Sequence, residues 1–155
     1  MIDFELLRKY FLEALWAFIS SLGFSLLFSL KGKKLLWASL GGSVAWLVYI
    51  FVGSFSNNHL FLCGMLSAMF ATIYAEIFAR ILKTPKTAFV FTGIVPMVPG
   101  GGLYYTMSNI ILRRYDVALQ YASSTSVTAI SLAFGIVVVI LGVKAIKYII
   151  KTYKK

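Results

Sequence analysis

The sequence predicts an all-α integral membrane protein with about five transmembrane helices, the fourth of which is broken at a Pro/Gly motif. Composition is the first reason: 60% of the 155 residues are hydrophobic and 13% are charged, whereas soluble domains carry about 25% charge. The second reason is that apolar runs of about 20 residues, long enough to cross a bilayer as helices, alternate with short charged clusters. The third is that Pro and Gly crowd into the middle of one such run.

The apolar runs divide one membrane domain, covering residues 1–155, into successive elements. A short polar lead precedes the first run, and a lysine cluster follows it instead of a small-residue cleavage site, so we expect a retained span. Small residues four apart in the next two runs, such as Ser39 with Ser43 and Gly64 with Ala68, predict closely packed helices. We expect spans at about 11–30, 35–53, 60–79, 87–112 and 117–143, followed by a basic tail at 144–155.

The segment 93–102 reads Gly-Ile-Val-Pro-Met-Val-Pro-Gly-Gly-Gly and lies inside the uncharged run 87–112. Each proline removes a backbone N–H and clashes with the carbonyl four residues earlier, and glycine gives a helix little support. Because bare peptide groups are costly in lipid, a broken span persists only where protein or a wet cavity covers it. The sequence therefore predicts a functional break that lines a substrate cavity. A proline kink packed against a neighbouring helix is the alternative.

The two helix ends at the break are expected to favour opposite charges. We expect the first half to end near Ile94 and the second to begin near Leu103, which leaves free N–H groups at 101–104. A helix N-terminus binds anions, so a carboxylate is the expected ligand. Free carbonyls at 90–93 suit an ammonium group or a cation. The residues expected to bind substrate here are Pro96, Pro99, Gly100, Gly101, Gly102, Tyr104, Tyr105 and Thr106.

A hydroxyl-bearing stripe marks the first half of the last span. Ser124, Thr128 and Ser131 recur at helical spacing and therefore share one face. Such a stripe faces protein or water rather than lipid. It is either a polar wall of the same substrate cavity or a set of hydrogen bonds between helices.

Glu76 is the only acid deep in the second half of a predicted span. Acids within a membrane are costly and often couple transport to protons or ions, which makes Glu76 the expected coupling residue. Arg80 lies four residues later, in the favourable order for an ion pair on a helix. A plain structural ion pair is therefore the alternative.

Positive charge is divided unevenly between the two sides of the predicted bundle. With five spans, one side holds only Arg8, Lys9, Arg113 and Arg114, and the other holds the remaining basic residues. Because basic loops stay in the cytoplasm, we expect the N-terminus outside and the C-terminus inside. The net charge of +10 is spread over short clusters rather than one solvated face, so we expect no nucleic-acid partner.

The basic tail presents most of its lysines on one helical face. This pattern fits contact with anionic lipids at the inner leaflet, or a solvated flank that only enforces orientation. The lysines of this face are Lys144, Lys147, Lys151 and Lys154.

Signals of catalysis are absent from the sequence. It contains no H-E-x-x-H, G-x-S-x-G or P-loop motif. One histidine and one cysteine do not make a metal site. We therefore expect no enzyme activity, no metal and no cofactor.

The Pro/Gly region resembles the signature of the threonine/serine exporter family. The resemblance lies in Pro85 with Lys86, in 95–100 (Val-Pro-Met-Val-Pro-Gly) and in 104–107 (Tyr-Tyr-Thr-Met). More narrowly, the chain is similar to the small subunit of the split, two-gene form, which corresponds to the second membrane half. The resemblance implies export of threonine and serine, or of a dicarboxylate such as succinate, across a bacterial cytoplasmic membrane. The family motif carries over at Pro96, Pro99, Gly100, Tyr104 and Thr106.

These observations lead to the hypothesis of a half-subunit of a secondary exporter that works by alternating access. The resemblance implies a larger membrane subunit as partner, and the small-residue spans also allow self-association. The alternatives are a scaffold or assembly subunit that transports nothing itself and, last, an intramembrane enzyme. Proton-motive force is the expected driver, because the sequence has no nucleotide-binding motif.

Overall fold

The computed structural model describes residues 4–153, and every element within them is a helix. This confirms the all-α prediction. The end of the basic tail, Lys154 and Lys155, lies outside the described residues. The elements are α1 (Phe4–Leu27), α2 (Lys33–Phe55), α3 (Leu60–Ile81), α4 (Lys86–Ile94), the 3-10 helix η1 (Val95–Met97), α5 (Gly100–Ile111) and α6 (Tyr115–Tyr153).

The helices have the length and apolar character of membrane spans. Four of them pass this test alone: Leu7–Leu27, Lys33–Phe55, Leu60–Ile81 and Tyr115–Thr152. The pair Lys86–Met97 and Gly100–Ile111 passes it together, bent by 56° at a short break. Counted as one span, this pair makes five, as predicted, and the chain is a multi-pass membrane protein.

The first and last helices extend beyond the predicted spans. The predicted polar lead is helical from Phe4, and α1 ends at Leu27, before a turn in which Ser29 and Gly32 adopt positive φ angles of 56° and 58°. At its other end α6 continues through the predicted tail to Tyr153, a helix of 39 residues. No proline or glycine follows Gly142 to stop it. At about 1.5 Å per residue this helix is roughly 58 Å long, longer than the ~30 Å hydrocarbon core.

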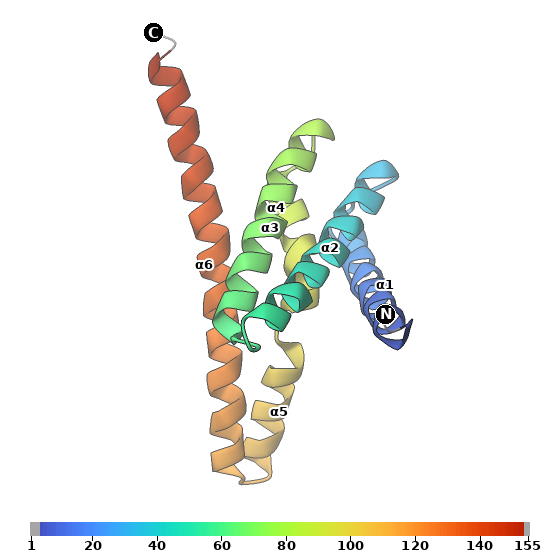
Figure 1. Cartoon of the computed structure of the whole chain (residues 1–155), viewed down its shortest axis with the longest axis vertical. Coiled ribbons are helices and arrows are strands. Elements are labelled where there is room, and N and C mark those ends of the chain that lie inside the picture. The colour runs from blue at the N-terminus through green and yellow to red at the C-terminus, as the bar shows by residue number, and fades with distance from the viewer. Residues whose placement is uncertain (1–3, 154–155) are drawn as a thin grey trace.

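Helices α2 and α3 form the centre of the molecule (Figure 1). Helix α1 packs on α2, α6 packs on α3, and α4 lies against both central helices. Helix α5 packs on the N-terminal part of α6, and this hairpin extends past the turn between α2 and α3 (Figure 1). The break between α4 and α5 therefore lies where the chain leaves the central helices and joins the protruding hairpin.

Small residues hold the helices close together, as their spacing predicted. A methyl group on Gly135 of α6 would come within 2.9 Å of the Ala68 Cβ on α3. Likewise, Gly41 of α2 lies against the ring of Tyr74, where an added Cβ would sit 2.7 Å from Cδ1. Dispersion contacts between such surfaces are the main force that joins helices in lipid.

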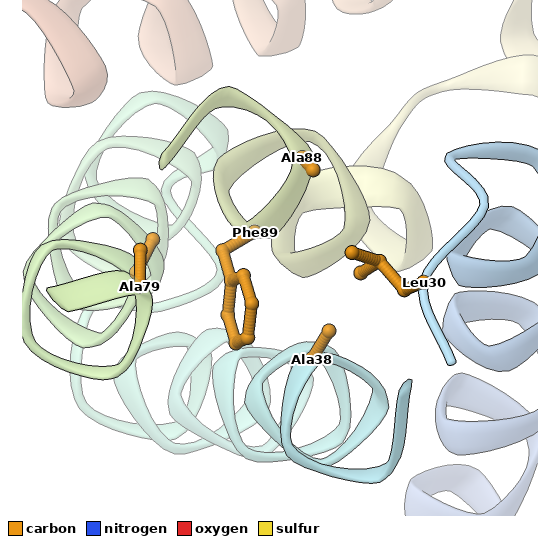
Figure 2. Close-up of a cluster of buried hydrophobic side chains, with 6 residues drawn as sticks. Leu30, Ala38, Ala79, Ala88 and Phe89 are labelled. Carbon is orange, nitrogen blue, oxygen red and sulfur yellow. The ribbon is translucent and has the colours of Figure 1, made fainter. Parts of the chain in front are cut away.

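One hydrophobic cluster fixes α4 against its neighbours (Figure 2). The ring of Phe89, which is 2% exposed, points from α4 between Ala79 of α3 and Ala38 of α2, and Leu30 closes the cluster from the turn after α1. Because α4 is anchored in this way, its C-terminal end is held in place where the break begins.

Candidate substrate site at the broken span

The break begins where the sequence predicted it and ends three residues earlier than expected. Helix α4 ends at Ile94, and Pro96 sits in η1. Val98 is extended, with φ −63° and ψ 126°, because the ring of Pro99 disfavours helical backbone in the residue before it. The helix resumes at Gly100 instead of Leu103, so only part of the expected run of free amides remains free.

Two amides at the start of α5 are left without a partner. The Gly100 N–H donates to the Val98 carbonyl at 2.8 Å, and the Leu103 N–H donates to the Pro99 carbonyl at 3.1 Å. Between them, the N–H groups of Gly101 and Gly102 have no backbone acceptor in the part of the chain that the structure describes. The prediction of free amides at 101–104 was therefore right for Gly101 and Gly102. It was wrong for Leu103, whose N–H donates to the Pro99 carbonyl, and for Tyr104, which lies inside the helix.

The first turn of α5 is open on one side. A methyl group built on Gly100 or Gly101 would meet no described atom within 4 Å. The free amides thus adjoin unfilled space at the positive end of a helix dipole, an arrangement that binds anions.

Thr125 of α6 closes the other side of this turn. Its side chain is 7% exposed, and within residues 4–153 its Oγ1 has no hydrogen-bond partner. Oγ1 contacts Gly102 so closely that a methyl group there would collide with it. A buried hydroxyl without a hydrogen-bond partner among the described residues therefore lies beside the Gly102 backbone.

Thr125 is not among the binding residues that the sequence predicts, although it directly follows Ser124 of the hydroxyl stripe. A usable signal existed, because Gly102 and Thr125 are equally far along the chain from the turn at Arg113 and Arg114. In a helical hairpin such residues face each other.

The carbonyl side of the break meets α1 and α2. Pro96 lacks the N–H that would have bonded the Thr92 carbonyl. This oxygen faces α2, 3.1 Å from the position of a Cβ on Gly42. The fully buried Ser21 Oγ of α1 contacts the same glycine and has no partner among the described residues. The freed carbonyl of Thr92 and the unpaired hydroxyl of Ser21 therefore lie close together beside Gly42. Thr92 is one of the residues at 90–93 for which the sequence predicts free carbonyls.

The predicted hydroxyl and aromatic residues of α5 occupy three different positions. Thr106 Oγ1 donates to the Gly102 carbonyl at 2.7 Å, within α5 itself. The Tyr105 ring stacks on Tyr121 of α6, with centroids 5.2 Å apart. Tyr104 is 68% exposed on the outer face. Tyr104 is the most exposed of the three, and Tyr105 is still 50% exposed.

The hydroxyl stripe of α6 is only partly near the break. The hydroxyls of all three stripe residues donate to backbone carbonyls of α6 itself. Thr128 and Ser131 pack against α3 at Gly64. The stripe therefore lies partly in the contact between α3 and α6. Within residues 4–153, however, none of its hydroxyls donates a hydrogen bond to another helix, so the hydrogen bonds between helices that the sequence allowed are not seen there. The residues of this stripe are Ser124, Thr128 and Ser131.

Glu76 lies at the far end of α4 from the break and holds three cations. Its carboxylate pairs with Arg80, as the spacing predicted, with Lys86 Nζ at 2.6 Å and with Lys147 Nζ at 3.2 Å. Lys86 begins α4, so the nine residues of that helix, about 13 Å, separate this ion cluster from the break. The cluster ties α3, α4 and α6 together.

Comparison with known proteins places the chain in a family. A family model described as the threonine/serine exporter ThrE matches residues 13–141. The chain belongs to this threonine/serine exporter family. None of the curated proteins and none of the solved structures matches it. Membership of a transporter family favours a protein that catalyses no reaction.

The matched region of the chain includes the whole break and Glu76. It also includes a hollow beside the break, which the sequence did not reveal. Pro96 lines a hollow of about 240 Å³ together with Glu13, Trp16 and Trp46. Glu13 also lines a neighbouring groove together with Lys9.

Proposed function

We propose that the chain is half of a secondary exporter that moves threonine and serine out of the cell by alternating access. A dicarboxylate such as succinate is the second substrate class. The observation that carries this proposal is the pair of unpaired amides, Gly101 and Gly102, at the start of a half-helix inside a membrane span. They adjoin open space and the free hydroxyl of Thr125.

A carboxylate fits this end of α5 on simple grounds. Its oxygens accept hydrogen bonds from both amides and from the Thr125 hydroxyl, and its charge complements the helix dipole. These interactions are stronger where the dielectric is low. Threonine, serine and succinate all carry such a group.

The ammonium group of an amino acid needs acceptors instead. The carbonyl of Thr92, freed by Pro96, supplies one on the other side of the break. A zwitterion therefore finds groups of both kinds along one broken span.

The open side of the site supports a larger membrane subunit as partner. Lipid can cover the exposed apolar side chains of α5, such as Leu103 and Met107, but it cannot bond the free amides. Bare peptide groups at membrane depth need protein or a water-filled cavity over them. A second membrane half would provide that cover, with substrate bound between the halves. Tyr104, exposed on the same helix, would face it.

We further propose that the chain sits in a bacterial cytoplasmic membrane with its N-terminus outside and its C-terminus inside. The ion cluster around Glu76 then lies at the cytoplasmic end, where it holds α3, α4 and α6 together. Loss of the charge on Glu76 would remove the shared acceptor and free these helices to move. This release of the helices is the physical basis on which we propose Glu76 as the residue that couples transport to protons.

Uptake into inverted vesicles that contain both subunits tests the proposal. We expect labelled serine and threonine to accumulate under a proton gradient, and we compare them with succinate. Gly101→Leu, which fills the open space, should abolish uptake while the protein still folds. Uptake that is equal with and without this chain would favour the alternative, a scaffold subunit that transports nothing.

A further inference from the structure

A second hollow, far from the break, lies between α3, α4 and α6. Its volume is about 430 Å³, and it is separate from the hollow beside Pro96. Lys86 of α4 and Lys144 and Lys147 of α6 line it, together with a single carboxylate, that of Glu76. Three lysines against one acid leave an excess of positive charge. The Glu76 carboxylate, already shared with Arg80, cannot neutralise it.

Apart from Thr72 and Thr87, the rest of the lining is apolar. Val90 follows Lys86 by one turn of α4, and Ile140 and Ile136 precede Lys144 by one and two turns of α6. The apolar side chains therefore lie deeper along the spans than the lysines do. The hollow has a basic rim at the end of the spans and an apolar wall toward the bilayer interior.

We propose that this hollow binds an anionic phospholipid. The phosphate of its headgroup contacts Lys144, Lys147 and Lys86, and an acyl chain lies along the apolar wall. Amphipathic pockets between spans, with basic residues at the headgroup level, recognise lipids in this way. A hydrophilic amino acid or a free phosphate gains nothing from the apolar wall, so the lining favours a lipid over either.

This site involves fewer of the tail lysines than the lipid contact that the sequence suggested. Of the lysines on that helical face, Lys144 and Lys147 line the hollow, whereas Lys151 lies about one turn beyond Lys147 and is not part of the lining. Lys86 joins them from a different helix, fifty-eight positions earlier than Lys144 in the chain. A bound lipid would therefore bridge α6 and the start of the broken span.

Native mass spectrometry of the purified full chain in detergent tests the site. The protein is titrated with phosphatidylglycerol, with phosphatidylcholine and with inorganic phosphate. In the double variant Lys144→Ala/Lys147→Ala we expect affinity for phosphatidylglycerol to fall by about 30-fold, from the usual contribution of a lysine near an anionic lipid surface. Glu76 keeps Arg80 and Lys86 as partners in this variant, so α3 and α4 stay linked. Helix α6 loses its ion pair with Glu76 but still packs along α3.

The matched control removes the same charge elsewhere at the same end of the molecule. Lys31→Ala/Lys33→Ala affects exposed residues at the turn between α1 and α2 and should bind phosphatidylglycerol like the wild type. If both double variants lost the same affinity for phosphatidylglycerol, the proposed site would be refuted, because the result would show only a general attraction of the lipid to positive charge.

A second pair of variants tests the acyl-chain wall. Val143→Trp fills the hollow and should weaken phosphatidylglycerol binding, whereas Leu141→Trp, at a side chain 58% exposed outside the hollow, should not. Displacement of phosphatidylglycerol by inorganic phosphate, with no effect of Val143→Trp, would show a free-anion site and refute the lipid. Binding of phosphatidylcholine as tight as that of phosphatidylglycerol would refute the role of the lysines.

Discussion

Replacement of Thr125 by Val is the sharpest single perturbation of the proposed substrate site. The change keeps the branched shape of the side chain and removes one hydroxyl. That hydroxyl is buried, and the described residues offer it no partner. A buried hydroxyl without a partner costs about 1–3 kcal/mol, so the substrate-free protein should become more stable, by ~1 kcal/mol.

Substrate binding should change in the opposite direction. A hydrogen bond to a charged group is worth about 1.5–3 kcal/mol, which corresponds to a loss in affinity of roughly ten- to a hundredfold. Thr125→Val should therefore raise the thermal unfolding temperature in detergent and raise the substrate concentration needed for half-maximal uptake into inverted vesicles. A role in packing alone cannot produce both effects together.

Two control variants make this result specific. Thr125→Ser keeps the hydroxyl and should retain most of the uptake. Ser67→Ala removes another fully buried hydroxyl, one that already donates to the Cys63 carbonyl at 2.6 Å within its own helix, and should leave uptake unchanged. Wild-type uptake by Thr125→Val would refute the idea that this hydroxyl meets the substrate.

Other predictions follow from the same geometry. Gly101→Leu should abolish uptake with unchanged thermal stability, since an added side chain meets no described atom within 4 Å; a large drop in stability would contradict the open space. Glu76→Gln should flatten the dependence of uptake on the pH gradient, and an unchanged dependence would remove Glu76 from coupling. Gly135→Ala should destabilise the protein by about 1–3 kcal/mol, the usual cost of overpacking, because its Cβ would lie within 2.9 Å of Ala68 Cβ; unfolding in detergent measures this. A reporter active only in the cytoplasm, fused after Lys155, should give signal, and its silence would reverse the orientation.

The break illustrates what the sequence could and could not predict. Its start was predictable because a proline two residues after Ile94 removes a helical N–H at a fixed distance. Its end was not, because three glycines looked too flexible to begin a helix. The first turn of a helix needs no intrahelical N–H partner, so glycines placed after Pro99 start α5 at little cost.

Contacts between residues that are far apart in the chain could not be predicted from the sequence. Arg80 was predictable as a partner of Glu76 because both lie on one helix face. Lys147 reaches the same carboxylate from seventy-one positions away, and only the packing of α6 on α3 brings it there. Glu13 likewise comes to line the same hollow as Pro96 through the packing of α1 beside η1.

The central claim is that the bare amides of a broken span hold the carboxylate of the substrate. Magnetic resonance of the protein labelled with ¹⁵N-glycine, together with its partner subunit in lipid bilayers, tests this directly, since the chain has only 12 glycines. We predict that serine or threonine moves the Gly101 and Gly102 amide signals toward stronger hydrogen bonding and leaves those of distant glycines, such as Gly142, in place. Substrate binding at saturation with both signals unmoved would contradict the account.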